Sequence, residues 1–372
     1  MHLMCAGPTK VRKSAIAAMG KFLTNPDLDP EYVTFHRQVE KKYSSLLNTD
    51  APSIIMLGEA IMGLEASVVS LMQKNDRVLV LSNGFFGAGF KDYVESYGGV
   101  ACVYENDFRK SFDLDELEKY IIENGPFKLA TMVHCETPTG LTNDIKKICG
   151  LLKKYDMLTI VDGVSSVLGE EINFDEINTD ILIGGTQKAI SAPTGLTLLT
   201  LSKKAIDLIL SRNDICGYYL NIKNYLKYEG DFAFPYTMNE NLVYALDAAL
   251  DEISKEDFVA IHKRFAAATR ASLKENDLEL YPESNFSSTL TAVVCPQKIS
   301  AKDLLGKMKS KGFLLSGSMG HLADRVFRIG HMGGNNNYED FLAMYKALDE
   351  CFLEFDFKTS LASSFEKFFK EF

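Results

Sequence analysis

Short apolar segments alternate with helical patterns over the first 200 residues. The segments predicted as strands are Ser53–Leu57, Arg77–Leu81, Val100–Tyr104, Leu129–His134, Leu158–Val161, Asp180–Ile183 and Leu196–Leu201. Between them apolar residues recur at helical spacing, as at Ile61, Leu64, Val68 and Leu71. Nearly continuous apolar strands separated by helices predict an α/β fold, in which helices cover both faces of a mostly parallel seven-stranded sheet. Ligands of such sheets bind beyond the carboxyl ends of the strands.

The pattern changes after residue 255. A helix over Asn239–Ile253 is predicted to lead out of a large domain, 15–252. A smaller α+β domain is predicted from 1–14, as an N-terminal arm, and 253–372. Its expected elements are a helix over 258–274, then Thr289–Val294, Ala301–Lys311, Val326–Ile329 and Tyr338–Cys351. Aromatic residues at helical spacing in the tail, Leu361–Phe372, predict a helix that covers a core or a partner subunit.

Composition and charge exclude several classes of function. The chain has 372 residues, 46% apolar and 24% charged, with a net charge of -10, which argues against a nucleic-acid surface. No apolar run approaches the ~20 residues that span a bilayer, and the N-terminus does not resemble a signal peptide. The seven cysteines are scattered without a CxxC pair, so neither a disulfide framework nor a metal site is expected. A cytoplasmic protein is predicted.

Lys188 and Asp162 are the strongest candidates for chemistry. Each follows a predicted buried strand, Lys188 in Ile183-Gly-Gly-Thr-Gln-Lys-Ala189 and Asp162 after Leu158–Val161. An ordinary surface lysine and a turn-capping aspartate are the plain alternatives. A lysine that holds a carbonyl cofactor as a Schiff base, beside a carboxylate that keeps a pyridine nitrogen protonated, points instead to pyridoxal phosphate (PLP). Val164 would then press on one face of the ring.

Other motifs also lie at predicted strand ends. In Asn83-Gly-Phe-Phe-Gly87, Phe86 either joins the core or stacks on the second ring face. The helix start in Gly58-Glu-Ala-Ile-Met-Gly63 offers backbone N–H groups to a phosphate. Arg328 forms either an internal ion pair or a fork for a substrate carboxylate. His134 and Cys135 are adjacent in a predicted strand, so their side chains point to opposite faces. His134 is therefore poorly placed to activate the Cys135 thiol as a nucleophile.

Taken together these segments resemble the class V, fold-type I PLP aminotransferases, above all the alanine–glyoxylate and serine–pyruvate branch. The resemblance runs from Ala6-Gly-Pro-Thr9 to about residue 350. The most specific motifs are His134…Glu136-Thr…Thr139-Gly140, Asp162-Gly-Val-Ser-Ser166, Gly185-Thr-Gln-Lys-Ala189 with Pro193-Thr-Gly195, and Arg328-Ile-Gly330.

The resemblance implies a role for each matching residue. Lys188 would form the Schiff base and move the substrate proton. The cofactor would contact Asp162, Val164 and Phe86 at its ring, Thr137 near its phenolic oxygen, and Ala60, Ile61 and Gln187 at its phosphate. Thr237 would reach the phosphate of a neighbouring subunit, which implies a homodimer. Arg328 and Gly7 would bind the substrate. The implied reaction is ping-pong transfer of an amino group from a small amino acid, such as alanine or serine, to glyoxylate or pyruvate.

Three positions depart from the family pattern. Glu59 stands in the phosphate loop where relatives carry hydroxyls, and we expect the backbone to bind the phosphate while Glu59 faces the substrate or a structural partner. Phe86 replaces a tryptophan, and Phe234 a tyrosine. The alternative functions are a PLP-dependent lyase or desulfurase and a non-catalytic relative. The loop His331–Asn335 has no cysteine to accept sulfur, and Lys188, Asp162 and Arg328 argue against a non-catalytic protein.

Overall fold

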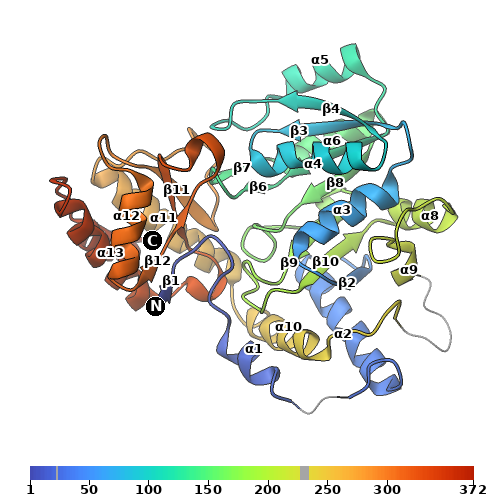
Figure 1. Ribbon diagram of the computed structural model, residues 1–372, viewed down its shortest axis with the longest axis horizontal. Helices are drawn as coiled ribbons and strands as arrows, with labels where there is room; N and C mark the ends of the chain where they lie inside the picture. Colours follow the sequence, from blue (N-terminus) through green and yellow to red (C-terminus); the bar gives the residue numbers. More distant parts are fainter. Residues whose placement is uncertain (22–23, 227–233) are drawn as a thin grey trace.

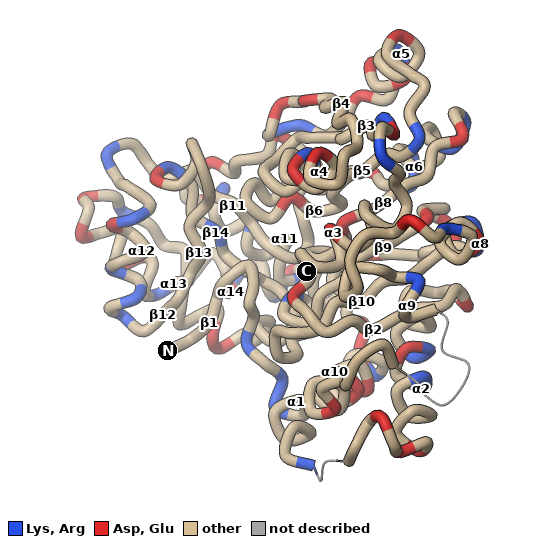
Figure 2. Tube along the Cα trace, turned by 45° about the vertical axis from the view of Figure 1, so that its right-hand side comes forward, with Lys and Arg blue, Asp and Glu red and all other residues tan. Residues whose placement is uncertain are grey.

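Two hydrophobic cores on the faces of one sheet and a third in the C-terminal region organise the molecule. The computed structural model describes residues 1–21, 24–226 and 234–372. Figure 1 shows the sheet with its covering helices in blue to yellow, beside the C-terminal elements in orange and red. Basic and acidic residues are interspersed along the chain (Figure 2). Within the described ranges, no helix combines the length and apolar character needed to cross a membrane.

The central sheet has seven strands and is mostly parallel, as predicted. Its order is β2 (Ser53–Leu57), β10 (Leu196–Leu201), β9 (Ile181–Gly185), β8 (Leu158–Asp162), β5 (Leu129–Val133), β3 (Arg77–Ser82) and β4 (Val100–Glu105). Only β10 runs against its neighbours, β2 and β9. The remaining pairs are parallel. A two-stranded ribbon of β6 (Cys135–Glu136) and β7 (Leu141–Thr142) follows β5.

Alternate residues of the strands feed two separate cores. In β2, Ile54 and Met56 belong to one core and Ile55 to the other, because successive side chains of a strand point to opposite faces. The first core includes residues of α3 (Ala60–Leu71), α4 (Phe85–Ser96), α8 (Lys203–Ser211) and α9 (Lys223–Leu226). The second includes residues of α1 (Lys13–Ala18), α2 (Pro30–Leu46), α5 (Leu114–Asn124), α6 (Ile145–Lys154), α7 (Phe174–Ile177) and α10 (Glu240–Ile253). Burial on both faces explains why the strands are so uniformly apolar.

The C-terminal elements build a third core, as expected for an α+β unit. A three-stranded sheet, β11 (Leu290–Val294), β14 (Val326–Gly330) and β13 (Ser316–Gly317), is combined with α11 (Phe258–Glu275), α12 (Ala301–Ser310), α13 (Tyr338–Leu353) and α14 (Leu361–Glu371). Two 3-10 turns, Gly320–Leu322 and Gly333–Asn335, flank β14. The chain's start, β1 (His2–Leu3), pairs in parallel with β12 (Phe313–Leu314). The boundaries 15–252 and 1–14 with 253–372 stay a prediction.

The aromatic tail covers this third core. Leu361 and Phe365 of α14 are fully buried. The ring of Phe365 lies 5.0 Å from that of Tyr345 in α13 and 6.5 Å from that of Phe265 in α11. The helical spacing of the tail therefore reflects packing within the chain, one of the two roles expected for it.

Candidate active site

Several strand ends and helix starts enclose one cavity. Asp162 is the last residue of β8, and Lys188 follows the end of β9 by three residues. Because β8 and β9 are parallel neighbours, both side chains lie at the same edge of the sheet. Seven of the predicted residues line the cavity together with Glu59, Leu64 and Ser165, namely Ala60, Ile61, Phe86, Thr137, Asp162, Val164 and Lys188.

Lys188 lies between this cavity and the N-terminal arm. Its Nζ donates a hydrogen bond to the carbonyl oxygen of Ala6 at 3.0 Å. Burial lowers the pKa of its ammonium group to about 8, and the Arg328 cation acts in the same direction. A Cβ atom at Gly7 would lie 2.7 Å from Nζ, and Gly7 has a φ of +100°, so only glycine lets the arm pass here without strain. A larger share of the lysine is therefore neutral near pH 7 than for an exposed lysine, although the ammonium form still predominates.

Asp162 presents a buried carboxylate to the same cavity. Its exposed fraction is 5%, and burial raises its pKa to about 6. The backbone N–H of Val164 donates to its Oδ1 at 2.8 Å, which opposes this shift and fixes the carboxylate next to Val164. A positively charged ring nitrogen beside Oδ2 would favour the ionised form further.

Phe86 is held at the start of α4 by a residue for which sequence reasoning gave no role. The carboxylate of Glu136 accepts the backbone N–H of Gly87 at 2.6 Å and that of Phe86 at 3.2 Å. Glu136 is fully buried, and burial raises its pKa to about 7. It therefore positions Phe86. Its place in the motif with His134 and Thr137 was the signal that could have indicated this.

Arg328 connects the C-terminal unit to the cavity. Its Nε donates to the carbonyl oxygen of Gly317 at 2.7 Å, and Nη1 donates to that of Thr137 at 3.1 Å. Burial lowers the pKa of the guanidinium to about 10. Among the described residues no carboxylate forms an ion pair with it, so the plain reading of an internal ion pair is wrong.

Glu59 contacts the groups expected to bind phosphate. Its carboxylate caps α3 by accepting the backbone N–H of Ile61 at 3.1 Å, and its other oxygen accepts Nε2 of Gln187 at 2.7 Å. The side chain is exposed on the rim of the cavity. Glu59 was expected to face the substrate or a structural partner, and its partners in the structure are the Ile61 N–H and the amide of Gln187. A carboxylate next to N–H groups at a helix start is favourable. Within residues 1–21, 24–226 and 234–372, Ile61 N–H and Gln187 Nε2 have no other acceptor.

Comparison with known proteins decides the family. The family model "Aminotransferase class-V" matches residues 1–321. The chain belongs to the class V aminotransferase family. An uncharacterized aminotransferase of Methanocaldococcus jannaschii is 33% identical over 337 residues, 89% of this chain and 87% of the relative. A serine–glyoxylate aminotransferase of Arabidopsis thaliana is 29% identical, covering 91% and 87%. The crystal structure of a ureidoglycine–glyoxylate aminotransferase of Bacillus subtilis superposes with a TM-score of 0.94 at 25% identity, covering 99% and 97%.

This class V aminotransferase is PLP-dependent, and its residues fit the ring of the cofactor. Lys188, Asp162, Phe86 and Val164 share one cavity, which gives a pyridine ring an amine, an acid and two apolar neighbours. The donors predicted for the phosphate lie at the start of α3 and on Gln187. In the structure both are bonded to a carboxylate, so this end of the cavity fits the phosphate only after that side chain moves.

Four predicted site residues do not line the cavity, namely Gly7, Gln187, Thr237 and Arg328. Thr237 is exposed and donates to Oδ2 of Asp27 at 2.7 Å, so its expected contact with a neighbouring subunit stays a prediction. Cys135 is buried and donates to Oγ of Ser287 at 3.2 Å. Burial raises the pKa of its thiol to about 12, which agrees with its rejection as a nucleophile. Ser165, which sequence reasoning missed, is hydrogen-bonded through Oγ to Thr137.

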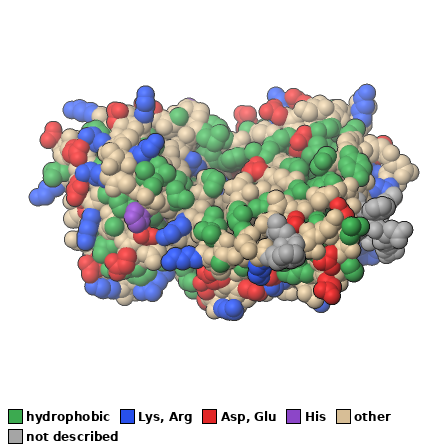
Figure 3. Space-filling model, turned by 60° about the horizontal axis from the view of Figure 1, so that its bottom comes forward, with side chains coloured by type: hydrophobic (Ala, Val, Ile, Leu, Met, Phe, Trp, Pro, Cys, Tyr) green, Lys and Arg blue, Asp and Glu red, His purple; other side chains and the backbone are tan. Residues whose placement is uncertain are grey.

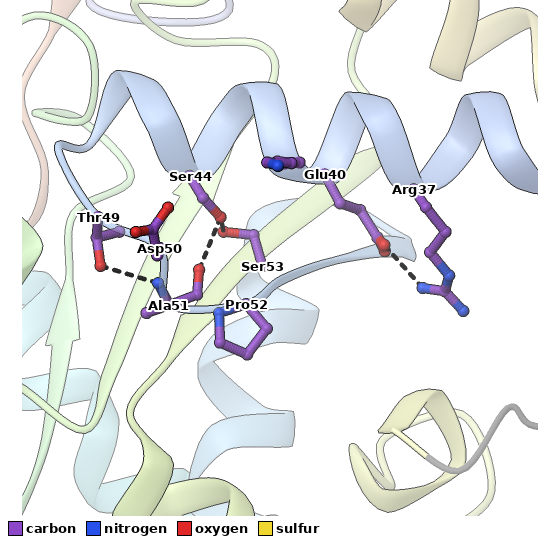
Figure 4. A pocket seen from close by; sticks show the side chains of 9 residues that line it. Arg37, Glu40, Ser44, Thr49, Asp50, Ala51, Pro52 and Ser53 are labelled. Carbon is purple, nitrogen blue, oxygen red and sulfur yellow. Dashed lines mark hydrogen bonds and ion pairs between the residues drawn. The ribbon is translucent and has the colours of Figure 1, made fainter.

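Another cavity, of about 390 Å³, lies between α2 and the start of β2 (Figure 4). Its polar groups bond to one another: Arg37 donates to Glu40 at 2.7 Å, and the hydroxyls of Ser44 and Ser53 lie 2.7 Å apart. Glu40 also accepts the backbone N–H of Ile55 in edge strand β2. None of the predicted site residues lines this cavity, and its contacts are those of a structural junction.

Proposed function

We propose that this aminotransferase moves the amino group of a small amino acid, such as alanine or serine, to a small 2-oxo acid, glyoxylate or pyruvate, by a ping-pong mechanism. The observation that carries this proposal is the placement of Arg328, a half-buried cation without an acidic partner among the described residues, which donates to the carbonyl oxygen of the cavity residue Thr137 and is close enough to lower the pKa of Lys188. Both substrates carry a carboxylate, which the guanidinium fork can bind. The serine–glyoxylate and ureidoglycine–glyoxylate relatives support the choice of acceptor.

Each cavity residue has a part in this reaction. When bound, the cofactor withdraws electrons from the substrate Cα through its protonated ring. Asp162 would hold the positive ring nitrogen with its carboxylate. Lys188 Nζ, with a pKa of about 8, can take the proton from Cα and return it as a general acid. Phe86 and Val164 would exclude water from the ring faces, which would limit unproductive protonation at the substrate Cα.

We also infer that the aminotransferase works as a homodimer whose partner covers the cavity. Ile61, at the cavity rim, has an exposed fraction of 46%, and Tyr218 and Tyr219 are each 58% exposed. Figure 3 shows hydrophobic side chains gathered over the middle of one face. Large exposed apolar residues of this kind are typical of interfaces. Thr237, which is exposed on the surface, would be supplied to the partner's phosphate site.

A half-reaction screen tests the proposed function. Protein loaded with PLP is mixed with single amino acids, and the loss of the bound cofactor's absorbance identifies the amino donors. Adding glyoxylate or pyruvate should restore the absorbance and release the aminated product. Lys188→Ala should abolish multiple turnover. Release of ammonia or sulfide without a requirement for an oxo acid would show a lyase or desulfurase and refute the proposal.

A further inference from the structure

The side chain of Glu59 occupies the anion-binding end of the cavity. Its two carboxylate oxygens accept one hydrogen bond from Ile61 N–H, at 3.1 Å, and one from Gln187 Nε2, at 2.7 Å. These donors come from two segments far apart in sequence, and both point at one anionic group. Such a convergence of a helix start and a side-chain amide is suited to a phosphate as well as to a carboxylate.

The backbone that carries Glu59 is firmly held. Thr197 in β10 donates its hydroxyl to the carbonyl oxygens of Gly58 and Glu59, at 3.1 and 3.0 Å. The N–H of Gly58 donates to the carbonyl oxygen of Gly195 at 2.9 Å. The side chain of Glu59, in contrast, is exposed and can rotate into solvent. Exchange at this site therefore requires a movement of one side chain and leaves the loop in place.

We propose that Glu59 occupies the subsite of the cofactor's phosphate, so that the phosphate binds only by displacing this carboxylate. Both groups are acceptors and both are anionic, so they cannot share Ile61 N–H and Gln187 Nε2. Glu59 thus lowers the affinity for PLP and leaves the affinity for pyridoxal, which has the same ring without the phosphate, unaffected. This inference rests on the ring-binding role that the proposed function gives to Lys188 and Asp162.

The experiment compares the binding of PLP and of pyridoxal to the whole chain after the cofactor has been removed. PLP and pyridoxal are titrated into wild type, Glu59→Gln and Glu59→Ser, and the absorbance change on binding gives each dissociation constant. Glu65→Gln is the matched control, because Glu65 lies on the same helix, α3, and accepts Tyr97 Oη at 2.6 Å, outside the cavity lining. Thermal unfolding confirms that each variant is folded.

We expect Glu59→Gln and Glu59→Ser to bind PLP about tenfold more tightly than wild type. In wild type the phosphate must first displace the Glu59 carboxylate from the start of α3, and an N-cap interaction is about large enough to account for a factor of ten. Pyridoxal affinity should change by less than about threefold, and Glu65→Gln should match wild type for both compounds. Inorganic phosphate should inhibit PLP binding more strongly in the Glu59 variants. Serine adds a hydroxyl donor, so Glu59→Ser should show the larger effect.

Weaker or unchanged PLP binding in both Glu59 variants would overturn the proposal, as would an equal gain for pyridoxal or for the Glu65 control. These outcomes are independent of the proposed reaction, since no turnover is measured. A protein that shows the expected PLP-specific gain and yet fails to transfer amino groups would refute the proposed function alone.

Discussion

Replacing Asp162 by asparagine should stabilise the cofactor-free protein at neutral pH. The carboxyl group is 5% exposed, and burial raises its pKa from 3.8 to about 6. The folded protein therefore holds this proton more tightly than the unfolded chain does. The stabilisation of the folded state by the protonated Asp162 is fully present below pH 3.8 and is lost as the pH rises through about 6. Because one pKa unit corresponds to ~1.4 kcal/mol, ionisation of Asp162 costs the folded state about 3 kcal/mol at pH 7.

Urea unfolding of wild type and Asp162→Asn at about pH 4.5 and about pH 7.5 measures this cost. Asparagine keeps the acceptor for Val164 N–H, so only the charge is removed. The stability advantage of the variant should grow by about 2 kcal/mol between the two pH values. The exposed Asp92 provides a control, Asp92→Asn, which should show no such growth. An advantage that is equal at both pH values, or a variant less stable than wild type at pH 7.5, would refute the reasoning. Saturating PLP should favour wild type, because ligand binding stabilises the form that binds it better.

Three further substitutions test other parts of the site. Glu136→Ala leaves two buried N–H groups without an acceptor and should lower the free energy of unfolding by about 2–5 kcal/mol in urea titrations; a loss under about 1 kcal/mol would contradict its positioning role. Gly7→Ala forces a Cβ against Lys188 at positive φ, so kcat should fall at least about tenfold with an unchanged circular dichroism spectrum; full activity would contradict it. Arg328→Lys loses the fork geometry, and KM for both the amino acid and the oxo acid should rise about tenfold or more at unchanged cofactor absorbance; a rise for one substrate alone would show that the other carboxylate binds elsewhere.

The sheet could be predicted because each strand is buried on both faces. Ser53–Leu57 and Leu196–Leu201 have the predicted bounds, and the strands predicted at Leu158–Val161 and Asp180–Ile183 end one and two residues later, at Asp162 and Gly185. A polar or glycine residue at a strand end carries no hydrophobic signal, although the backbone pairing continues through it. The bounds of the strands were therefore the weak part of the prediction, while their existence and order along the chain were the strong part.

Residues that act by holding others could not be predicted. Glu136 reaches α4 from the ribbon β6–β7, some 50 residues away in sequence, and its hydrogen bonds are to backbone groups that any sequence would supply. Glu59 was recognised as unusual, but its direction depends on Gln187, which the fold brings to it from beyond β9. A spacing pattern reports which face of an element a residue occupies and says nothing about partners on another element.

The two residues given the main parts in the proposed reaction, Lys188 and Arg328, stand beside different sheets, which the order of residues along the chain does not reveal. Lys188 follows β9 of the central sheet by three residues, whereas Arg328 stands on β14 of the three-stranded C-terminal sheet. Each residue is tied to a segment distant in sequence by a hydrogen bond, Arg328 Nη1 to the carbonyl oxygen of Thr137 and Lys188 Nζ to that of Ala6. If Arg328 and Lys188 act as proposed, a small shift of β14 against the central sheet would move the substrate carboxylate relative to the amine that takes the Cα proton. Since a misplacement of ~1 Å can cost about a hundredfold in rate, we expect these two contacts to matter for catalysis as well as for stability.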